Sequence, residues 1–328
     1  MHPHGALVDA AGADVVLDEE IGAGGEGSVY RLKGDPAAVA KIYHAAASAD
    51  KASKLAALTA VASPALTGVA SWPTRTVIAK RTRATVGIVM PRVDQHHEIH
   101  NLYSPAHRKV TFPHADWSFL VRAARNCAVA FDVIHGCGHV IGDVNQGGIL
   151  VSKQATIKLI DCDSFQVKHG GHLFPCDVGV SHFTPPELQG RSFTGLHRTE
   201  DHDRFGLAIL VFHLLFMGRH PFVGRFLGKG DLPIEQAIAE GRFAFSENAS
   251  RMQMRAPPFA LRLQDASADI AALFERAFRL PSNGHIGRPA AVEWARALGT
   301  LESSLIRCAR YAARLPDSEP STEGRWAY

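Results

Sequence analysis

Short apolar runs, interrupted by glycine, proline or charged residues, fill the first part of the chain. Runs of about four to eight residues with many β-branched side chains are typical of strands. Between two of these runs, residues 45–62 are rich in alanine and carry Leu55 and Leu58 at helical spacing, which predicts one helix. The predicted strands cover residues 29–32, 38–43, 76–79 and 86–90.

After Val93 the apolar residues recur at helical spacing. Residues 205–217 are apolar almost all round, which is typical of a helix buried in a core. The sequence therefore predicts an α+β fold, in which a small antiparallel β lobe with one helix precedes a larger, mainly helical lobe. The predicted helices of the second lobe cover residues 117–134, 205–217, 268–280 and 289–306, the last with Pro289 in its first turn.

The pattern divides the chain into four segments. Residues 1–14 are small and polar, and residues 313–328 are rich in Pro, Ser and Glu toward their end. Both compositions are typical of flexible termini. Between them we expect a bilobal unit, with the small lobe at residues 15–92 and the large lobe at residues 93–312.

The composition narrows the class of protein. Of the 328 residues, 46% are hydrophobic and 20% are charged, with a net charge of +3, so disordered and fibrous classes do not fit. Five scattered cysteines without a CxxC pair favour neither a zinc site nor a disulfide framework. The sequence shows no concentrated basic stripe, no signal peptide and no long apolar run. We therefore expect a cytoplasmic protein whose partners include neither nucleic acid nor membrane.

A glycine-rich stretch at residues 21–29 has the pattern GxGxxGxV. Alone this pattern is weak evidence, because dinucleotide-binding folds share its spacing. In those folds the glycines open a helix, whereas here residues 28–32 continue as a strand and residues 33–36 form a turn. The stretch therefore predicts a β-hairpin whose tip folds over nucleotide phosphates. The candidate nucleotide-binding residues are Gly22, Gly24, Gly25, Gly27 and Val29.

Three charged residues stand at the ends of apolar runs. Lys41 ends the run that begins at Ala38, and a lysine there is costly to bury unless an anion, such as the phosphates of a nucleotide, meets it. The alternative is an edge-strand lysine that faces water, but the glycine hairpin just before Lys41 favours the nucleotide. Asp143 and Asp161 each end a β-like apolar run. Two such aspartates are a stronger signal than one.

Seven ordered motifs between residues 15 and 300 resemble those of the protein kinase superfamily. The resemblance implies the bilobal kinase fold and an ATP-dependent phosphotransferase that uses Mg²⁺ or Mn²⁺. After the glycine loop, the motifs are Ala38-Val39-Ala40-Lys41, Ile141-Gly142-Asp143, Asp161-Cys162-Asp163, Pro185-Pro186-Glu187, Asp203-Arg204-Phe205-Gly206 and Arg288-Pro289.

The resemblance also implies a role for each residue of the site. Asp143 would be the catalytic base that accepts the proton of the substrate hydroxyl, Asp161 the metal ligand, and Lys41 the lysine that binds the phosphates. Glu187 would pair with Arg288. The adenine and the hinge that joins the lobes would use Val29, Val39, Leu150, Met90, the carbonyl of Pro91 and the N–H of Val93.

More narrowly, the glycine loop and Gly142-Asp143-Val144-Asn145 look like a bacterial subgroup of eukaryotic-like Ser/Thr kinases. Its kinases are encoded beside a metal-dependent phosphatase and a von Willebrand A-type protein, in the tellurite-resistance-associated phosphorylation triad. This likeness implies a signalling role, a protein substrate, and those two proteins as partners.

The metal-binding pattern departs from that of the family at one position. Gly148 stands where an asparagine usually holds a second metal ion, and glycine has no side-chain oxygen. Asn145 and Asp163 are the candidates for the replacement.

Two further departures concern activation. The lysine of a kinase usually pairs with a helix glutamate, but no glutamate lies between Lys41 and Arg92, so Glu26 or Asp161 could serve instead. Gly142 stands where an arginine usually reads a phosphate on the activation loop, so we expect activation without loop phosphorylation.

Three functions remain open on these residues. An active Ser/Thr protein kinase with an atypical catalytic loop is favoured by Lys41, Asp143 and Asp161. A pseudokinase that binds nucleotide or acts as a scaffold is favoured by Gly148 and the missing helix glutamate. A small-molecule kinase is favoured by Gly142, but the Pro-Pro-Glu segment argues against it.

Overall fold

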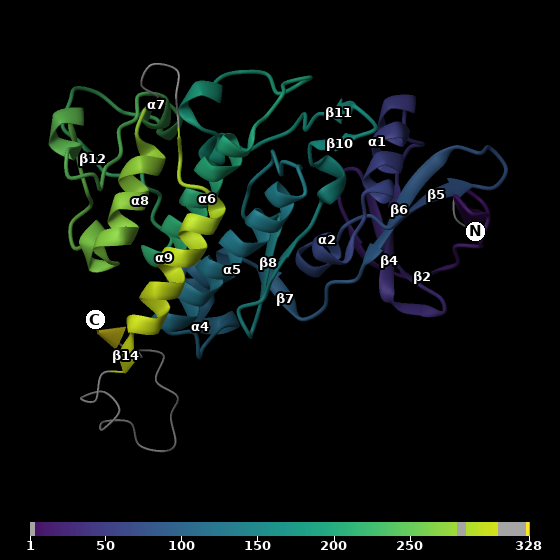
Figure 1. Ribbon diagram of the computed structural model, residues 1–328, viewed down its shortest axis with the longest axis horizontal. Helices are drawn as coiled ribbons and strands as arrows, with labels where there is room; N and C mark the ends of the chain where they lie inside the picture. The colour runs from purple at the N-terminus through teal and green to yellow at the C-terminus, as the bar shows by residue number, and fades with distance from the viewer. Residues whose placement is uncertain (1–3, 281–286, 308–325, 328) are drawn as a thin grey trace.

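The chain folds into two lobes that lie end to end along the long axis of the molecule (Figure 1). The computed structural model describes residues 4–280, 287–307 and 326–327. The smaller lobe holds the main sheet, and the larger lobe is mostly helical. The predicted bilobal α+β fold is confirmed.

The small lobe is built on a six-stranded antiparallel sheet in the order β1-β5-β6-β4-β3-β2. Apolar side chains from its strands form a hydrophobic core of the small lobe, separate from the main core. All four predicted strands are present within the sheet. The strands are β1 (Leu7–Asp9), β2 (Leu17–Ala23), β3 (Gly27–Leu32), β4 (Asp35–Tyr43), β5 (Arg75–Ala79) and β6 (Thr85–Pro91).

The expectation of a flexible N-terminus is wrong for β1. Leu7 and Val8 are only 5% and 2% exposed, and β1 pairs with β5. Leu7 joins the small-lobe core, and this burial stabilises the strand despite its polar surroundings in the sequence. Residues 1–3 lie outside the described part of the chain.

The helix expected at residues 45–62 is present as α1 (Ala49–Ala60), and a second helix, α2 (Pro64–Val69), follows it. Ser48 caps α1 by accepting a hydrogen bond from the N–H of Lys51, at 3.2 Å. Ser63 caps α2 in the same way, and Pro64 begins it. A serine followed by proline therefore starts a second helix where the alanine-rich pattern alone suggested none.

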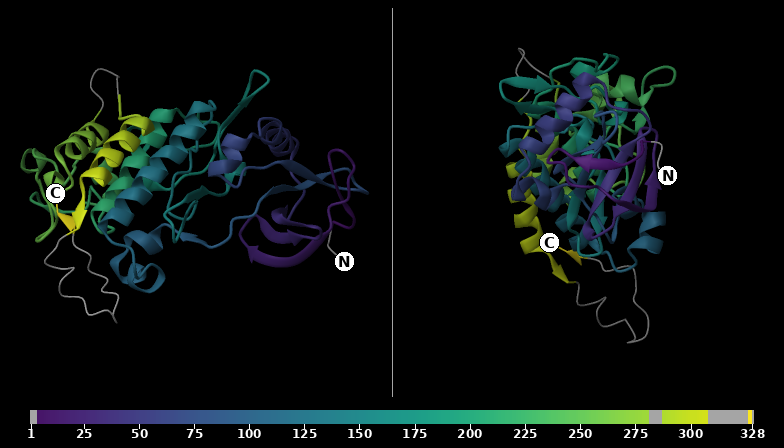
Figure 2. Two further views of the ribbon diagram at one scale, coloured as in Figure 1. Left: turned by 60° about the horizontal axis from the view of Figure 1, so that its bottom comes forward. Right: turned by 90° about the vertical axis from the view of Figure 1, so that its right-hand side faces the viewer.

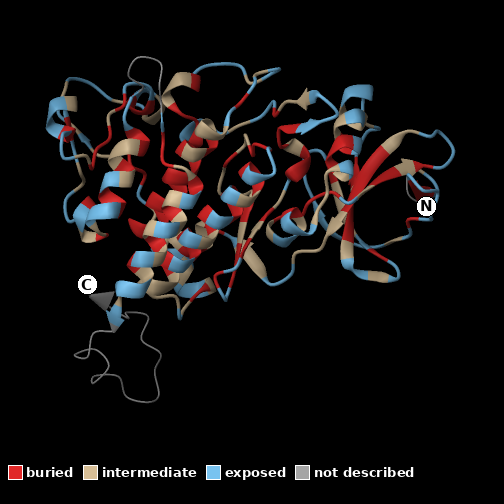
Figure 3. Ribbon diagram, viewed as in Figure 1, coloured by how far each residue is buried: buried red, intermediate tan, exposed pale blue. Residues whose placement is uncertain are grey.

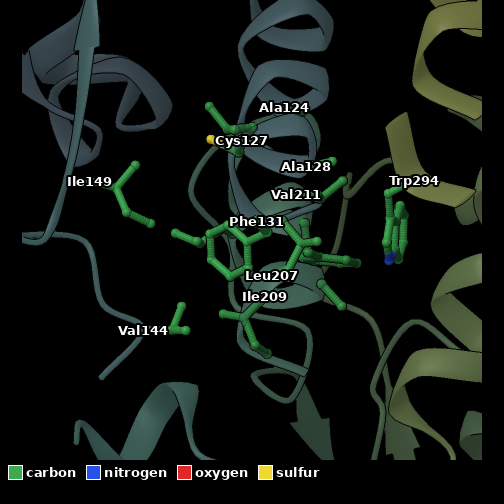
Figure 4. Packing of buried hydrophobic residues seen from close by; sticks show 14 of the residues in the cluster. Ala124, Cys127, Ala128, Phe131, Val144, Ile149, Leu207, Ile209, Val211 and Trp294 are labelled. Carbon is green, nitrogen blue, oxygen red and sulfur yellow. The ribbon is translucent and has the colours of Figure 1, made fainter. Parts of the chain in front are cut away.

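The large lobe is organised around three long helices, α5, α6 and α9, that run side by side (Figure 2). The helix α6 is buried almost all round, as its sequence predicted (Figure 3). Phe131 of α5, Leu207 of α6 and Trp294 of α9 belong to one apolar cluster (Figure 4). The helices are α3 (His100–Tyr103), α4 (Pro105–Thr111), α5 (Trp117–Gly136), α6 (Glu200–Leu215), α7 (Ile234–Ala239), α8 (Ala268–Phe278) and α9 (Ala291–Ser304).

The last helix begins slightly later than predicted. Its first residue is Ala291, and the carboxylate of Glu293 accepts a hydrogen bond from the N–H of Ala290 at 2.8 Å. Pro289 therefore precedes the helix instead of lying in its first turn. Within the described residues, no helix combines the length and apolar character that a membrane span requires.

Short strands complete the large lobe and the C-terminus. A three-stranded sheet and the β10–β11 hairpin lie close to the small lobe (Figure 1). In the tail expected at residues 313–328, residues 326–327 form β15, and the other residues lie outside the described part of the chain. The strands are β7 (His96–Glu98), β8 (Ile149–Ser152), β9 (Ile157–Leu159), β10 (Val167–His169), β11 (His172–Phe174), β12 (Arg225–Phe226), β13 (Met254–Arg255), β14 (Ile306–Arg307) and β15 (Trp326–Ala327).

Candidate active site

The amino group of Lys41 is the centre of an acidic cluster between the lobes. Lys41 lies in β4, opposite Val29 of β3, and its side chain is 12% exposed. Its Nζ lies 2.9 and 3.0 Å from the two carboxylate oxygens of Asp163, 3.5 Å from Oδ1 of Asp161 and 3.9 Å from Oε2 of Glu26. A buried lysine thus meets three carboxylates, of which Asp163 makes the hydrogen bonds.

Asp163 is the partner of Lys41 that the sequence did not indicate. Its side chain is nearly buried, and the hydroxyl of Tyr43 donates a hydrogen bond to its Oδ2 at 2.8 Å. Burial raises the pKa of Asp163, but the charge of Lys41 and the hydrogen bonds donated by Lys41 and Tyr43 outweigh it, so the pKa lies below its usual range. Glu26 and Asp161, the expected partners, lie near Lys41 but make no hydrogen bond with it.

Asp161 stands at the turn that follows β9. It has a φ of 56° and a ψ of 34°, a left-handed conformation that is uncommon for a residue other than glycine. Its side chain is 65% exposed, and its carboxylate forms an ion pair with Lys41. Cys162, which follows it, is buried in the core of the large lobe.

The loop that carries Asp143 is fixed by α6. The carboxylate of Asp203, in α6, accepts hydrogen bonds from the N–H groups of Ile141 and Gly142 at 2.7 and 2.8 Å, and lies 3.0 Å from Nε2 of His135. This contact joins the loop to the most buried helix of the large lobe. The aspartate of the Asp-Arg-Phe-Gly motif therefore anchors the loop to α6.

Asp143 itself has an unusual electrostatic environment. Burial raises its pKa, and the hydrogen bond with Asn145 and the charge of Arg198 offset this only in part. Its Oδ1 is buried and has no hydrogen-bond partner among the described residues. Buried polar atoms are rarely left unpaired, so this oxygen is a natural acceptor for an incoming donor such as a hydroxyl.

Asn145 shapes the turn after Asp143. Its Oδ1 accepts hydrogen bonds from the N–H groups of Gly147 and Gly148 at 2.8 and 2.9 Å, and its Nδ2 donates to the carbonyl of Asp143 at 3.1 Å. An amide oxygen accepts two hydrogen bonds at most. Metal binding by Asn145 remains a prediction, and it would require release of at least one of these bonds.

The three predicted metal residues therefore differ in their availability. Both oxygens of Asp163 are engaged by Lys41 and Tyr43, whereas the carboxylate of Asp161 is exposed. Magnesium is usually held by one or two carboxylates together with substrate phosphates, so the donor set at Asp161 fits this metal. Among the described residues, no group of three or more His, Cys, Asp or Glu side chains is placed to hold a metal by itself.

The glycine stretch forms the predicted hairpin between β2 and β3, and no helix follows it. The N–H of Gly24 donates to the carbonyl of Gly27 at 2.9 Å, which closes the tip. A Cβ on Gly27 would lie 2.3 Å from the carbonyl oxygen of Ile42, so only glycine fits there, whereas Gly22 and Gly25 face open space. The dinucleotide-binding alternative is excluded, because it requires a helix at this point.

The predicted adenine residues lie on the strands around this hairpin and on β8. Val39 is opposite Met90 across the sheet, and Leu150 lies in β8 of the large lobe. The carbonyl of Pro91, expected to accept from the adenine, already accepts a hydrogen bond from Oγ of Ser71 at 2.7 Å. Adenine binding by these residues, and by Val93 after β6, remains a prediction.

The expected pair between Glu187 and Arg288 is present and is bidentate. Nη1 and Nη2 of Arg288 each lie 2.9 Å from one of the two carboxylate oxygens of Glu187, and the Arg288 side chain is fully buried. Asp201 adds a second acidic partner, at 2.6 Å from Nη1. Burial raises the pKa of Glu187, but Arg288 outweighs this effect and holds the pKa below its usual range.

Known proteins resemble this chain in sequence and in fold. No protein-family model matches the chain. Protein kinase YegI of Escherichia coli strain K12 is 42% identical over 301 residues, which are 91% of this chain and 46% of that protein. Protein kinase YegI of E. coli O157:H7 is 42% identical over 304 residues, 92% of this chain and 47% of that protein. The chain thus spans about half the length of the curated relatives it matches.

A solved structure supports the same fold. The kinase domain of ROP18, in complex with AMP-PNP and sucrose, has a TM-score of 0.58 and covers 94% of this chain and 87% of its own. At 13% identity this likeness concerns the fold alone. The fold is that of a protein kinase domain, and the curated relatives are named as protein kinases.

Proposed function

We propose that this chain, with its protein kinase fold, is an ATP-dependent Ser/Thr protein kinase with an atypical catalytic loop. One observation carries the proposal: Lys41 Nζ lies 3.5 Å from Oδ1 of Asp161, and Asp161 lines the same small cavity as Asp143. Three residues far apart in the sequence meet at one place, and they are the residue types that phosphate transfer needs.

Each of these residues has a chemical role in the proposal. Lys41 binds the phosphates of ATP, and the hydrogen bonds that it donates to Asp163 hold its ammonium group in place. Asp143 accepts the proton of the attacking hydroxyl, for which its unpaired Oδ1 is available. Asp161 would hold Mg²⁺ or Mn²⁺, and the metal would supply positive charge that stabilises the phosphates during transfer.

A protein substrate is favoured over a small molecule. The bidentate Glu187–Arg288 pair fixes the end of the Pro-Pro-Glu segment, which antibiotic kinases lack. The Ser/Thr specificity, the cytoplasmic location and the signalling role belong to the same proposal. So do a von Willebrand A-type protein and a phosphatase as partners, on the strength of the subgroup resemblance.

A pseudokinase is the second candidate, and specific contacts favour it. Gly148 supplies no metal ligand, and the possible substitutes Asn145 and Asp163 already use their oxygens in hydrogen bonds. Such a protein would bind nucleotide without transferring phosphate. Measurement of turnover separates the two candidates.

The test is a transfer assay with the purified chain, ATP, a generic protein substrate, and either Mg²⁺ or Mn²⁺. We expect Asp143→Ala to abolish transfer and to leave nucleotide affinity nearly unchanged, while Lys41→Ala also weakens nucleotide binding. Asp132→Ala, which removes an exposed carboxylate of α5, is the matched control. Absence of transfer by the unaltered chain with both metals would support the pseudokinase, and equal effects of the two variants on affinity would contradict their assigned roles.

A further inference from the structure

The activation segment, residues 161–187, is held against α1 by a lysine. Nζ of Lys54 donates hydrogen bonds to the carbonyl of Ser164 at 2.9 Å and to the carbonyl of Pro175 at 2.7 Å. These two carbonyls lie before and after the β10–β11 hairpin. One ammonium group on the small-lobe helix therefore binds both ends of the hairpin.

The position of the first carbonyl connects this contact to the active site. Ser164 directly follows Asp163, the partner of Lys41. The turn from Asp161 to Ser164 is thus held by two lysines from the small lobe, one on its carboxylates and one on its main chain. If Lys54 released the segment, the contact between Asp163 and Lys41 would lose its support on one side.

A second cation binds the segment from the large lobe. Arg198 is almost completely buried; its Nη2 donates to the carbonyl of Val178 at 2.6 Å, and its Nη1 donates to the carbonyl of Gly142. Gly142 has a φ of +76°, and a Cβ there would lie 2.6 Å from Cβ of Cys176. An arginine at position 142, which could bind a phosphate on the segment, has no room in this arrangement.

A lysine that donates to carbonyls at a helix surface often has no role beyond local packing. Two features distinguish Lys54. Its partners lie at the two ends of a hairpin instead of in its own helix, and the charged donor engages main-chain groups that no side-chain modification alters. Hydrogen bonds from a charged donor are stronger than neutral ones, which suits a contact that must order a segment.

We propose that Lys54 is a positioning residue that orders the activation segment by binding its main-chain carbonyls, and thereby keeps Asp163 on Lys41 without loop phosphorylation. Arg198 provides the corresponding contact on the large lobe. The effect on catalysis rests on the proposed kinase function, but the effect on the order of the segment does not.

The first test measures backbone amide hydrogen exchange in the nucleotide-free full chain. In Lys54→Met we expect exchange across residues 164–178 to rise by about tenfold, the equivalent of losing a hydrogen bond to a charged group. Lys54→Arg, which keeps a charged donor, should restore most of the protection. Lys109→Met, which removes an exposed lysine of α4, should change nothing in this segment.

Two results of this test would overturn the proposal. One is unchanged exchange across residues 164–178 in Lys54→Met. The other is an equal rise across both lobes together with a lower Tm, because it would show that Lys54 serves global stability. Treatment of the unaltered chain with a phosphatase should leave the exchange unchanged, and a rise as large as that of Lys54→Met would also overturn the proposal.

The second test separates this inference from the proposed function. In the transfer assay, Lys54→Met should lower kcat by roughly 10- to 100-fold and leave the KM for ATP within about twofold, because positioning is lost and phosphate binding is kept. A rise in KM with kcat unchanged would contradict the positioning role. If the unaltered chain transfers no phosphate, the proposed function fails, and hydrogen exchange alone decides the role of Lys54.

Discussion

Two cations, the buried Arg288 in the large lobe and the largely buried Lys41 between the lobes, are each held by acidic side chains. The partners of the two cations differ in how they relate to the kinase pattern. Arg288 is paired with Glu187 and Asp201, as the kinase pattern predicted for Glu187. Lys41 is paired with Asp163 of the activation segment, whereas a kinase usually pairs this lysine with a glutamate of the small-lobe helix. The Glu187–Arg288 pair of the large lobe thus matches the kinase pattern, whereas the Lys41–Asp163 pair of the candidate active site differs from it.

The new pair couples two parts of the site directly. Asp163 is two residues from Asp161, so the contact that orients Lys41 also fixes the turn that presents the carboxylate of Asp161. The helix α1 contributes a lysine, Lys54, to the same turn in place of a glutamate. Assembly of the site therefore depends on the activation segment more directly than on the orientation of α1.

The largest expected effect is on the Arg288 pair. Arg288→Met leaves Glu187 and Asp201 without their partner in a buried environment, and removal of one member of a buried ion pair costs about 3–5 kcal/mol. Denaturant-induced unfolding measures the loss. Arg279→Met, at an exposed arginine, should change the unfolding free energy by less than about 0.5 kcal/mol. A loss below about 1 kcal/mol for Arg288→Met would show that the pair is not structural.

A smaller effect, on turnover, is expected at Asp163. Asp163→Asn keeps the shape of the side chain and removes its charge, so Lys41 is oriented only by Asp161 and Glu26. We expect transfer to fall by roughly 30- to 100-fold, which corresponds to about 2–3 kcal/mol and to the loss of charged hydrogen bonds. The transfer assay measures it, with Asp132→Asn as the control. Unchanged turnover would show that Asp161 or Glu26, and not Asp163, is the functional partner of Lys41.

A substitution at Gly148, where a kinase usually has a metal-binding asparagine, should increase activity. A Cβ on Gly148 would meet its nearest neighbour, Nδ2 of Asn145, at an ordinary distance of 3.7 Å, so a side chain fits there. We expect low activity with a preference for Mn²⁺, and Gly148→Asn should raise turnover with Mg²⁺ by about tenfold, because magnesium depends strictly on its oxygen ligands. Metal titrations of both proteins measure the gain. No gain with Mg²⁺ would contradict this prediction, because it would show that the missing side-chain oxygen at Gly148 does not limit turnover.

The two aspartates Asp143 and Asp163 should respond to pH in opposite directions. The pKa of Asp143 is raised by burial, so its ionised form destabilises the fold above that pKa, and Asp143→Asn should raise the unfolding free energy at pH 7 by about 1 kcal/mol. The gain should vanish near pH 3, because the carboxyl is then protonated in both states. Asp163 has a lowered pKa, so its stabilisation is present at pH 7 and is lost as the pH falls through that value. Parallel pH profiles for both variants would contradict these assignments.

The sequence predicted the scaffold well because its signals are local. The periods of apolar residues located the long helices, and Glu187 and Arg288 stood in recognisable motifs. The helix α2, which lies beyond the predicted range 45–62, also had a local signal, Ser63 followed by Pro64. The local signal for β1 was weaker, because it consisted only of Leu7 and Val8 within a polar stretch.

The ion pair of Lys41 had no local signal. Asp163 is 122 residues from Lys41 and stands where the family has a glycine, so its role depends on how the two lobes meet. The contacts of Lys54 could not be predicted from the sequence either, because its partners are main-chain carbonyls, which every residue carries. The motif pattern showed that a partner was missing, and only the three-dimensional arrangement supplied one.

The most direct test of the central claim, that Asp163 is the partner of Lys41, is a double-mutant cycle on the free energy of unfolding. The cycle uses Lys41→Met, Asp163→Asn and the double variant, and it requires no catalytic activity. We expect a coupling energy of about 1.5–3 kcal/mol for this pair. The same cycle with Glu26→Gln, at an exposed carboxylate 3.9 Å from Lys41, should give less than about 0.5 kcal/mol. Additive effects of Lys41→Met and Asp163→Asn, or a larger coupling with Glu26, would contradict the account.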